Sequence, residues 1–365
     1  MSVLLGFDIG GTAVKAGLVD ETGAILLSET RSVDFDGYRT PILTTVTALA
    51  RELLEKSPEK PAGIGVSATG QIDVRSGTVI GVGASLGNWL GSEIARTLGD
   101  AFGLPVTVIN DANAAALGEQ RYGRARGMEN VLVVTVGTGV GGGIIENGRL
   151  IEGRRGIGGE IGHFSIKFDG EPCPCGNRGC FERYGSTGAL VRRFTGDPAL
   201  LEALGVPAED VDGKVIFAHL DHPAVAAAVS AWIDCIAAGI VSLIHVFNPE
   251  IVLVGGGISR EEEHFISPLR ERVLYRAMAQ FAKNLSRGSG GARQYGRPAR
   301  RLRLFPAGAR GRLTQRFKKR NKKAGSRRIF RQLPAVFVPF SGRPGRCPGR
   351  TGKCTRGRRC PPACR

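Results

Sequence analysis

The feature that most constrains the fold of this 365-residue chain is a pattern of apolar strands and glycine turns that occurs twice. In the first half, the apolar run at 4–9 enters the turn GGT, and the run AVKAGLVD leads back. In the second half, VLVVTVGT at 131–138 enters a glycine turn and GGGIIENGRL returns. Short turns between apolar runs indicate antiparallel neighbours. The pattern predicts an α/β fold with two duplicated halves, each a mixed sheet carrying helices.

The longest apolar stretch, residues 224–247, is consistent with a membrane span or with a buried core helix. Asp234 in its middle and its many alanines favour the core helix, so we expect no membrane contact. At the start of the chain, an apolar strand runs directly into a glycine loop that contains Asp8, which is not the pattern of a signal peptide. We therefore expect a cytoplasmic protein.

Charge divides the chain into two unlike parts. Residues 287–365 hold 25 of the 50 Lys and Arg and none of the 33 Asp and Glu. This tail therefore carries +25, whereas residues 1–286 carry 25 minus 33, or −8. The tail is either a basic arm that binds nucleic acid non-specifically through phosphates or the product of a shifted reading frame, and the abrupt loss of acidic residues favours the second. In both cases we expect it to be disordered, with residues 1–111 and 112–286 forming the two folded domains.

Residues 158–182 bring together side chains that bind metals in a segment rich in Gly and Pro. The spacing is H-x9-C-x-C-x4-C, and three thiolates with one imidazole fill a tetrahedral zinc shell without leaving a position for water. The alternatives are a disulfide or buried thiols, with an ordinary core histidine. Gly176 and Gly179 allow the chain to turn between ligands, which favours a structural zinc ion. The predicted ligands are His163, Cys173, Cys175 and Cys180.

Three glycine turns, each at the end of an apolar strand, are candidate phosphate sites. Glycines let backbone N–H groups approach an anion closely, and a carboxylate in such a turn can hold Mg²⁺ through water. A single glycine turn is more often only a turn, but three together favour a nucleoside triphosphate bound between the two halves. The candidate ATP-binding residues are Asp8, Gly10, Gly11, Thr12, Lys15, Thr138, Gly139, Gly255, Gly256 and Gly257.

Asp111 is the candidate catalytic residue. It follows an apolar strand and begins a helix, where its carboxylate can accept a proton from an attacking hydroxyl group. Asn110 beside it can offer amide hydrogen bonds to the same substrate. The alternative is that Asp111 is only the N-cap of the helix.

These segments occur in the order found in the ROK family of sugar kinases (repressor, open reading frame, kinase), and the chain up to about residue 286 resembles that family. The resemblance implies a ribonuclease H-like (actin-like ATPase) fold with the active-site cleft between two α/β domains. The matching motifs are DIGGT at 8–12, NDANAAALGE at 110–119, VGTGVGGG at 136–143, GGEIGH at 158–163, CPCGNRGCFE at 173–182 and NPEIVLVGGG at 248–257.

The resemblance also implies an activity: an ATP-dependent kinase similar to glucokinases and N-acetylmannosamine kinases, acting on a hexose or N-acetylhexosamine. Asp111 would be the base that activates the sugar 6-hydroxyl for attack on the γ-phosphate of ATP. The other sugar hydroxyls would be bound by Asn110, Glu160, His163 and Glu182, with His163 also a zinc ligand. A homodimer is the default expectation for a soluble enzyme.

Two departures from the family pattern leave other functions open. Ser85-Leu86 stands where the family often has Asn-Leu facing the sugar, and the basic tail replaces a closing strand and an Ala/Gly-rich helix. An inactive kinase is therefore one alternative. Another is a sugar-sensing transcriptional regulator without catalysis, because the family includes repressors. Those carry a helix-turn-helix before the DIGGT strand, whereas seven residues precede Asp8 here, which argues against a repressor.

Overall fold

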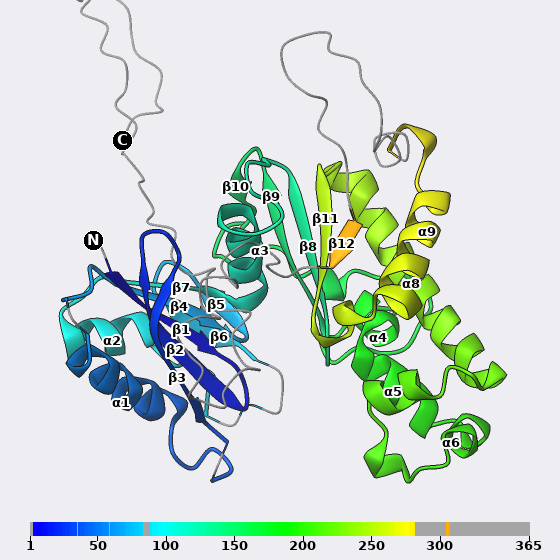
Figure 1. Cartoon of the computed structure of the whole chain (residues 1–365), viewed down its shortest axis with the longest axis horizontal. Helices are drawn as coiled ribbons and strands as arrows, with labels where there is room; N and C mark the ends of the chain where they lie inside the picture. Colours follow the sequence, from blue (N-terminus) through cyan, green and yellow to red (C-terminus); the bar gives the residue numbers. More distant parts are fainter. Residues whose placement is uncertain are drawn as a thin grey trace, which may run out of the picture.

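The first of two five-stranded sheets lies in the N-terminal half of the molecule (Figure 1). The computed structural model describes residues 3–34, 36–57, 59–82, 86, 88–281 and 304–306. In spatial order, the strands of this sheet are β3 (Ile25–Ser32), β2 (Ala13–Asp20), β1 (Val3–Ile9), β4 (Ile64–Ala68) and β7 (Val106–Asn110). A small hairpin beside it is formed by β5 (Gln71–Asp73) and β6 (Thr78–Gly81).

The second sheet repeats the topology of the first. In spatial order its strands are β10 (Arg149–Leu150), β9 (Val140–Glu146), β8 (Val131–Val136), β11 (Ile251–Gly255) and β12 (Leu304–Pro306). In both sheets the first three strands in chain order pair antiparallel, and the other two add in parallel. The predicted α/β fold with duplicated halves is confirmed.

Strand β12 departs from the sequence prediction. Its three residues belong to the segment predicted to be a disordered tail, but they pair with β11 in the register Val252↔Leu304 and Val254↔Pro306. The strand occupies the position that β7 holds in the first sheet. A parallel edge strand needs only backbone pairing with its neighbour, which amino-acid composition does not reveal. The rest of the predicted tail lies outside the described residues.

Central strand β8 is buried on both faces, which explains its continuous apolar run. Leu132 and Val134 belong to the core cluster that also contains the buried face of helix α8 (Pro223–Phe247). Val131 and Val133 belong to a separate cluster with Ala116 of helix α3 (Asp111–Arg121). Alternate side chains of a strand point to opposite faces, so β8 anchors helices on both sides of its sheet.

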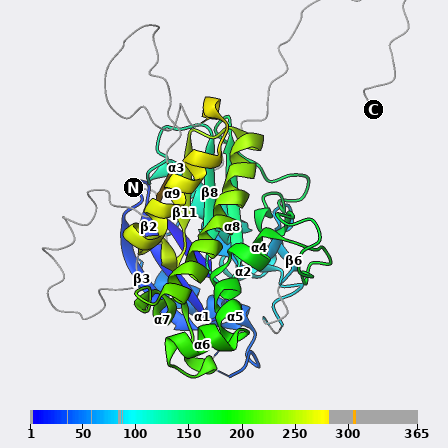
Figure 2. The same ribbon diagram turned by 90° about the vertical axis from the view of Figure 1, so that its right-hand side faces the viewer.

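The helices of the first half pack on its sheet, whereas the short helices of the second half pack mainly on one another and on α8. On the first half, α1 buries an amphipathic stripe with helical spacing that includes Val46, Leu49 and Leu53. Figure 2 shows α8 and α9 crossing in front of β8 and β11. The first half carries α1 (Ile42–Glu55) and α2 (Ile94–Phe102). The second half carries α4 (Phe181–Gly185), α5 (Thr187–Thr195), α6 (Pro198–Leu204), α7 (Gly213–Ala218) and α9 (Ser267–Arg276).

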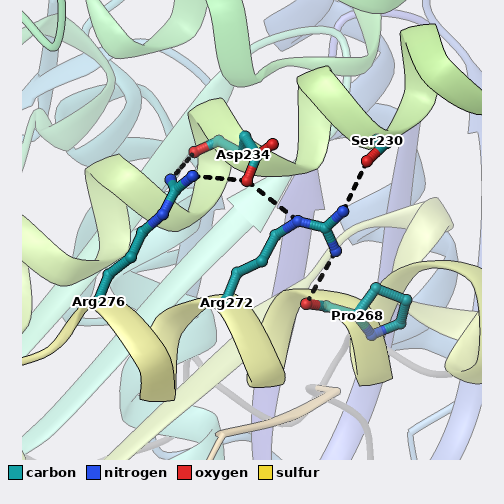
Figure 3. Close-up of polar contacts among 5 residues, drawn as sticks. All are labelled: Ser230, Asp234, Pro268, Arg272 and Arg276. Atoms are coloured by element: carbon teal, nitrogen blue, oxygen red, sulfur yellow. Dashed lines mark hydrogen bonds and ion pairs between the residues drawn. The ribbon is translucent and has the colours of Figure 1, made fainter.

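Helix α8 is the predicted core helix. Its length and hydropathy would also suit a membrane span, but half of its apolar window is buried inside the fold. Asp234, the acidic residue of this stretch, ties α8 to α9 (Figure 3). Its Oδ1 accepts hydrogen bonds from Arg272 Nε at 3.0 Å and Arg276 Nη2 at 2.6 Å, and Arg272 also donates to Ser230 Oγ at 2.7 Å.

We expect Asp234→Ala to lower the free energy of unfolding, because two arginines of α9 lose their shared acceptor. The Asp234 side chain is 41% exposed, so solvent screening should limit the loss to about 1 kcal/mol. Urea denaturation measures it. The matched control is Arg96→Ala, which removes an isolated surface pair with Glu93 and should change the free energy by less than about 0.5 kcal/mol. Equal effects of the two substitutions would contradict a structural role for Asp234.

Candidate active site

The first phosphate turn, Gly10 to Thr12, joins β1 to β2. Its backbone closes through Gly10 N–H, which donates to Ala13 O at 3.0 Å. Tyr38, which the sequence did not single out, donates its hydroxyl to Gly11 O at 2.7 Å and has a left-handed φ of 61°. Such a backbone conformation is uncommon for a bulky residue and indicates a constrained position. No motif marks Tyr38 in the sequence.

On the other side of this turn, a Cβ added to Gly11 would meet Leu86 at 2.9 Å, so glycine permits the close approach. Ser85, where the sequence differs from the family pattern, lies outside the described residues. Lys15, on β2 directly opposite Asp8, places its Nζ 3.5 Å from the Asp8 carboxylate. Lys15 therefore offsets the charge of Asp8 at this turn.

The second and third glycine turns lie next to each other, because β8 and β11 are parallel neighbours. A Cβ on Gly256 would lie 1.9 Å from Val136 O, and Gly256 has φ +98°, so only glycine fits there. Gly255 is the buried last residue of β11, which leaves Gly256 and Gly257 as the members of this turn that solvent reaches. Thr138 is exposed on the neighbouring turn.

Asp111 occupies the first position of α3, and Asn110 is the N-cap. The Oδ1 of Asn110 accepts from the N–H of Ala112 at 2.9 Å and of Asn113 at 3.3 Å. The alternative that Asp111 is only an N-cap is therefore wrong. Asn110 Nδ2 donates to Gly70 O at 2.9 Å, and a side-chain hydrogen bond from Asn110 also acts on the carboxyl group of Asp111.

The carboxyl group of Asp111 is perturbed in the way expected of a general base. Desolvation of the carboxyl group by the surrounding protein atoms is the largest cause and raises its pKa to about 6, although the residue is exposed, and the negative charges of Asp8 and Glu160 act in the same direction. A hydrogen bond from the Ala112 N–H opposes the rise. Water reaches the residue, but the surrounding protein removes part of the solvation of its carboxylate. Carboxylates from both halves thus converge here, and a pKa near neutrality suits proton transfer.

Two further predicted sugar ligands lie beside the second glycine turn and the metal cluster. Glu182, at the start of α4, accepts a hydrogen bond through Oε2 from Val140 N–H at 3.0 Å. The same oxygen would be 2.3 Å from a Cβ on Gly139, so the glycine makes room for the carboxylate. His163 ends a short 3₁₀ turn, Ile161–His163, that begins after Glu160.

The four predicted zinc ligands are gathered in one place: the donor atoms of His163, Cys173, Cys175 and Cys180 all lie within 4.8 Å of one another. Cys173 Sγ is 3.7 Å from His163 Nδ1, and Cys175 Sγ is 3.6 Å from Cys180 Sγ, so these cysteines are free thiols and the disulfide alternative is not borne out. Such separations suit a tetrahedral zinc shell.

The thiols of this cluster differ in acidity. The backbone N–H of Asn177 lowers the pKa of Cys175 to about 7, whereas burial raises that of Cys180 to about 12. A divalent cation would allow all three thiols to ionise together. The residues therefore fit a structural zinc ion.

Comparison with known proteins places these features in a family. The ROK family profile matches residues 4–291. A glucokinase from Thermotoga maritima is 35% identical over 287 residues, covering 76% of this chain and 89% of that protein. The crystal structure of a ROK family glucokinase from Streptomyces griseus in complex with glucose and AMPPNP has 31% identity and a TM-score of 0.67, covering 84% of this chain and 94% of the other. A xylose repressor from Caldicellulosiruptor bescii is 30% identical over 290 residues, covering 76% of this chain and 72% of that protein.

We expect the purified protein to contain about one zinc ion per chain by elemental analysis, because the four donors complete a closed shell. Cys173→Ser should lose most of the metal and lower the thermal midpoint, since a structural ion contributes to folding. Cys235→Ser, which changes a cysteine on α8 outside the cluster, should keep its zinc. A zinc-free wild-type protein, or full zinc in Cys173→Ser, would rule out this site.

Proposed function

Because the chain belongs to the ROK family, we propose that it is an ATP-dependent kinase that phosphorylates the 6-hydroxyl of a hexose or N-acetylhexosamine. Glucose and N-acetylmannosamine are the first candidate substrates. The observation that carries the proposal is the position of Asp111 at the first residue of α3, beside the N-cap Asn110, where desolvation and the charges of Asp8 and Glu160 raise its pKa to about 6. The glucokinase relatives support the same reaction class.

In the proposed reaction, Asp111 accepts the proton of the sugar 6-hydroxyl as its oxygen forms a bond to the γ-phosphorus. The bond between that phosphorus and the β–γ bridging oxygen breaks, and ADP leaves. Phosphoryl transfer depends mainly on alignment and charge neutralisation, so one positioned base and a set of donors suffice. Hydroxyls of the sugar would be held by Asn110, Glu160, His163 and Glu182.

The phosphates of ATP would bind at the exposed backbone of the glycine turns, which offer N–H groups without side chains in the way. Thr12 and Thr138 are exposed at the first two turns and add hydroxyl donors. Asp8, with a part-exposed carboxylate, would hold Mg²⁺ through water, and that ion would supply charge neutralisation at the phosphates. Zinc would brace the loop that carries His163 and Glu182, away from the chemistry.

The kinase proposal predicts sugar-dependent release of ADP in a coupled assay with glucose, mannose, N-acetylglucosamine and N-acetylmannosamine. Zinc-loaded, folded protein should turn over at least one of them, and the ratio of kcat/KM values identifies the substrate. Sugar binding by calorimetry without ADP release from any of the four would favour the rival function, a non-catalytic sugar sensor. The similarity to a xylose repressor is the observation behind that rival.

Asp111→Asn tests the assigned base. The amide cannot accept the proton, so kcat should fall by roughly 10²- to 10⁴-fold while the zinc content stays unchanged. In the wild type, Asp111 is protonated below its pKa of about 6, so kcat/KM should fall about tenfold per pH unit on the acidic side and be level above. A pH profile flat down to pH 5 would show that another group is the base.

A further inference from the structure

An ion pair joins the two halves of the molecule through segments other than the glycine turns. Arg155 lies in the loop between β10 and Glu160, and Asp73 ends β5 beside the first sheet. Arg155 donates through Nε at 3.0 Å and Nη2 at 2.8 Å to Asp73 Oδ2. The Asp73 side chain is 13% exposed and that of Arg155 is 54% exposed, so the carboxylate is sheltered while the guanidinium faces solvent.

Two neighbouring contacts reinforce the pair. The Val74 N–H donates to Arg155 O at 3.2 Å, which ties the backbones of the two halves together. A Cβ on Gly156 would lie 2.3 Å from Val74 Cγ1, and Gly156 has φ +87°. Glycine at this position therefore allows the loop to lie directly against the first half.

Asp73 is also held in place by a contact within the first half of the molecule. The backbone N–H of Arg75 donates to Asp73 Oδ1 at 3.1 Å, which leaves Oδ2 for Arg155. The hydrogen bond from Arg155 is the largest cause of a lowered Asp73 pKa, so the carboxylate is charged at neutral pH. The contact is thus a charge-assisted hydrogen bond with an oriented acceptor.

The same loop leads directly to Glu160, which needs such a restraint. Glu160 is exposed at the end of this loop, directly before the turn Ile161–His163, so its position depends on the backbone that carries it. Gly158 N–H donates to Glu152 O at 2.9 Å, so the loop that contains Arg155 is closed two residues before Glu160.

We infer that Asp73 and Arg155 form a clamp that positions Glu160 for the sugar by holding its loop against the first half of the molecule. The inference rests on the proposed function for the identity of the ligand. Both are positioning residues, because neither needs to touch substrate. The clamp acts on sugar binding and leaves the phosphate turns, which lie on other loops, unaffected.

The test measures KM for sugar and for ATP in Asp73→Asn and Arg155→Gln. We expect each to raise the sugar KM roughly threefold to tenfold with the ATP KM unchanged. The double variant Asp73→Arg with Arg155→Asp restores opposite charges and should return the sugar KM to within about twofold of wild type. Arg154→Gln, next to Arg155 in the same loop, is the matched control and should behave as wild type.

Amide hydrogen exchange gives a readout independent of turnover. Peptides that cover residues 151–160 should exchange roughly tenfold faster in Asp73→Asn than in the wild type, because the loop opens more often. Wild-type protein without turnover on any sugar would reject the proposed function, while exchange would still test the clamp. An active wild type with unchanged sugar KM and unchanged exchange in Asp73→Asn would overturn the clamp.

Discussion

The constraint on which the site depends is the convergence of like charges. Asp8, Asp111 and Glu160 come from three separate segments, and the charges of Asp8 and Glu160 add to desolvation, the largest cause, in raising the pKa of Asp111. Their repulsion has to be offset by interactions elsewhere, including Lys15 beside Asp8 and the helix N-terminus at Asp111. A carboxyl group whose pKa is raised by desolvation and neighbouring charges is typical of active sites, where it can act as a base near neutral pH.

The duplicated sheets supply the framework for this convergence. Each half places a glycine turn between its first two strands, and parallel pairing of β8 with β11 brings the third turn beside the second. Because β8 is buried on both faces, small displacements of its end are costly, and the turns keep their relative positions. Strand β12 shows that the second sheet also uses residues 304–306, from a segment whose composition suggested no part in the fold.

The metal cluster has a supporting place in this arrangement. Its segment lacks a long helix or sheet ladder, and its described structure consists of turns and isolated bridges such as Ser165↔Cys180. Ligands drawn together across a short loop compensate for the missing backbone pairing. His163 and Glu182 flank this cluster, so bracing the loop also sets the positions of two proposed sugar ligands.

The sequence by itself indicated the duplicated pattern of strands and glycine turns, the core helix at 224–247 and the grouping of His163 with the three cysteines, because local periodicity and short spacings encode them. Only the tertiary structure decided that Asn110, not Asp111, caps α3, and that Asp73 and Arg155 meet across 82 positions of sequence. It also decided that Tyr38 supports Gly11 and that residues 304–306 complete a sheet. These contacts join segments that are far apart in the sequence, and no local pattern in a single sequence shows which distant segments will pack together.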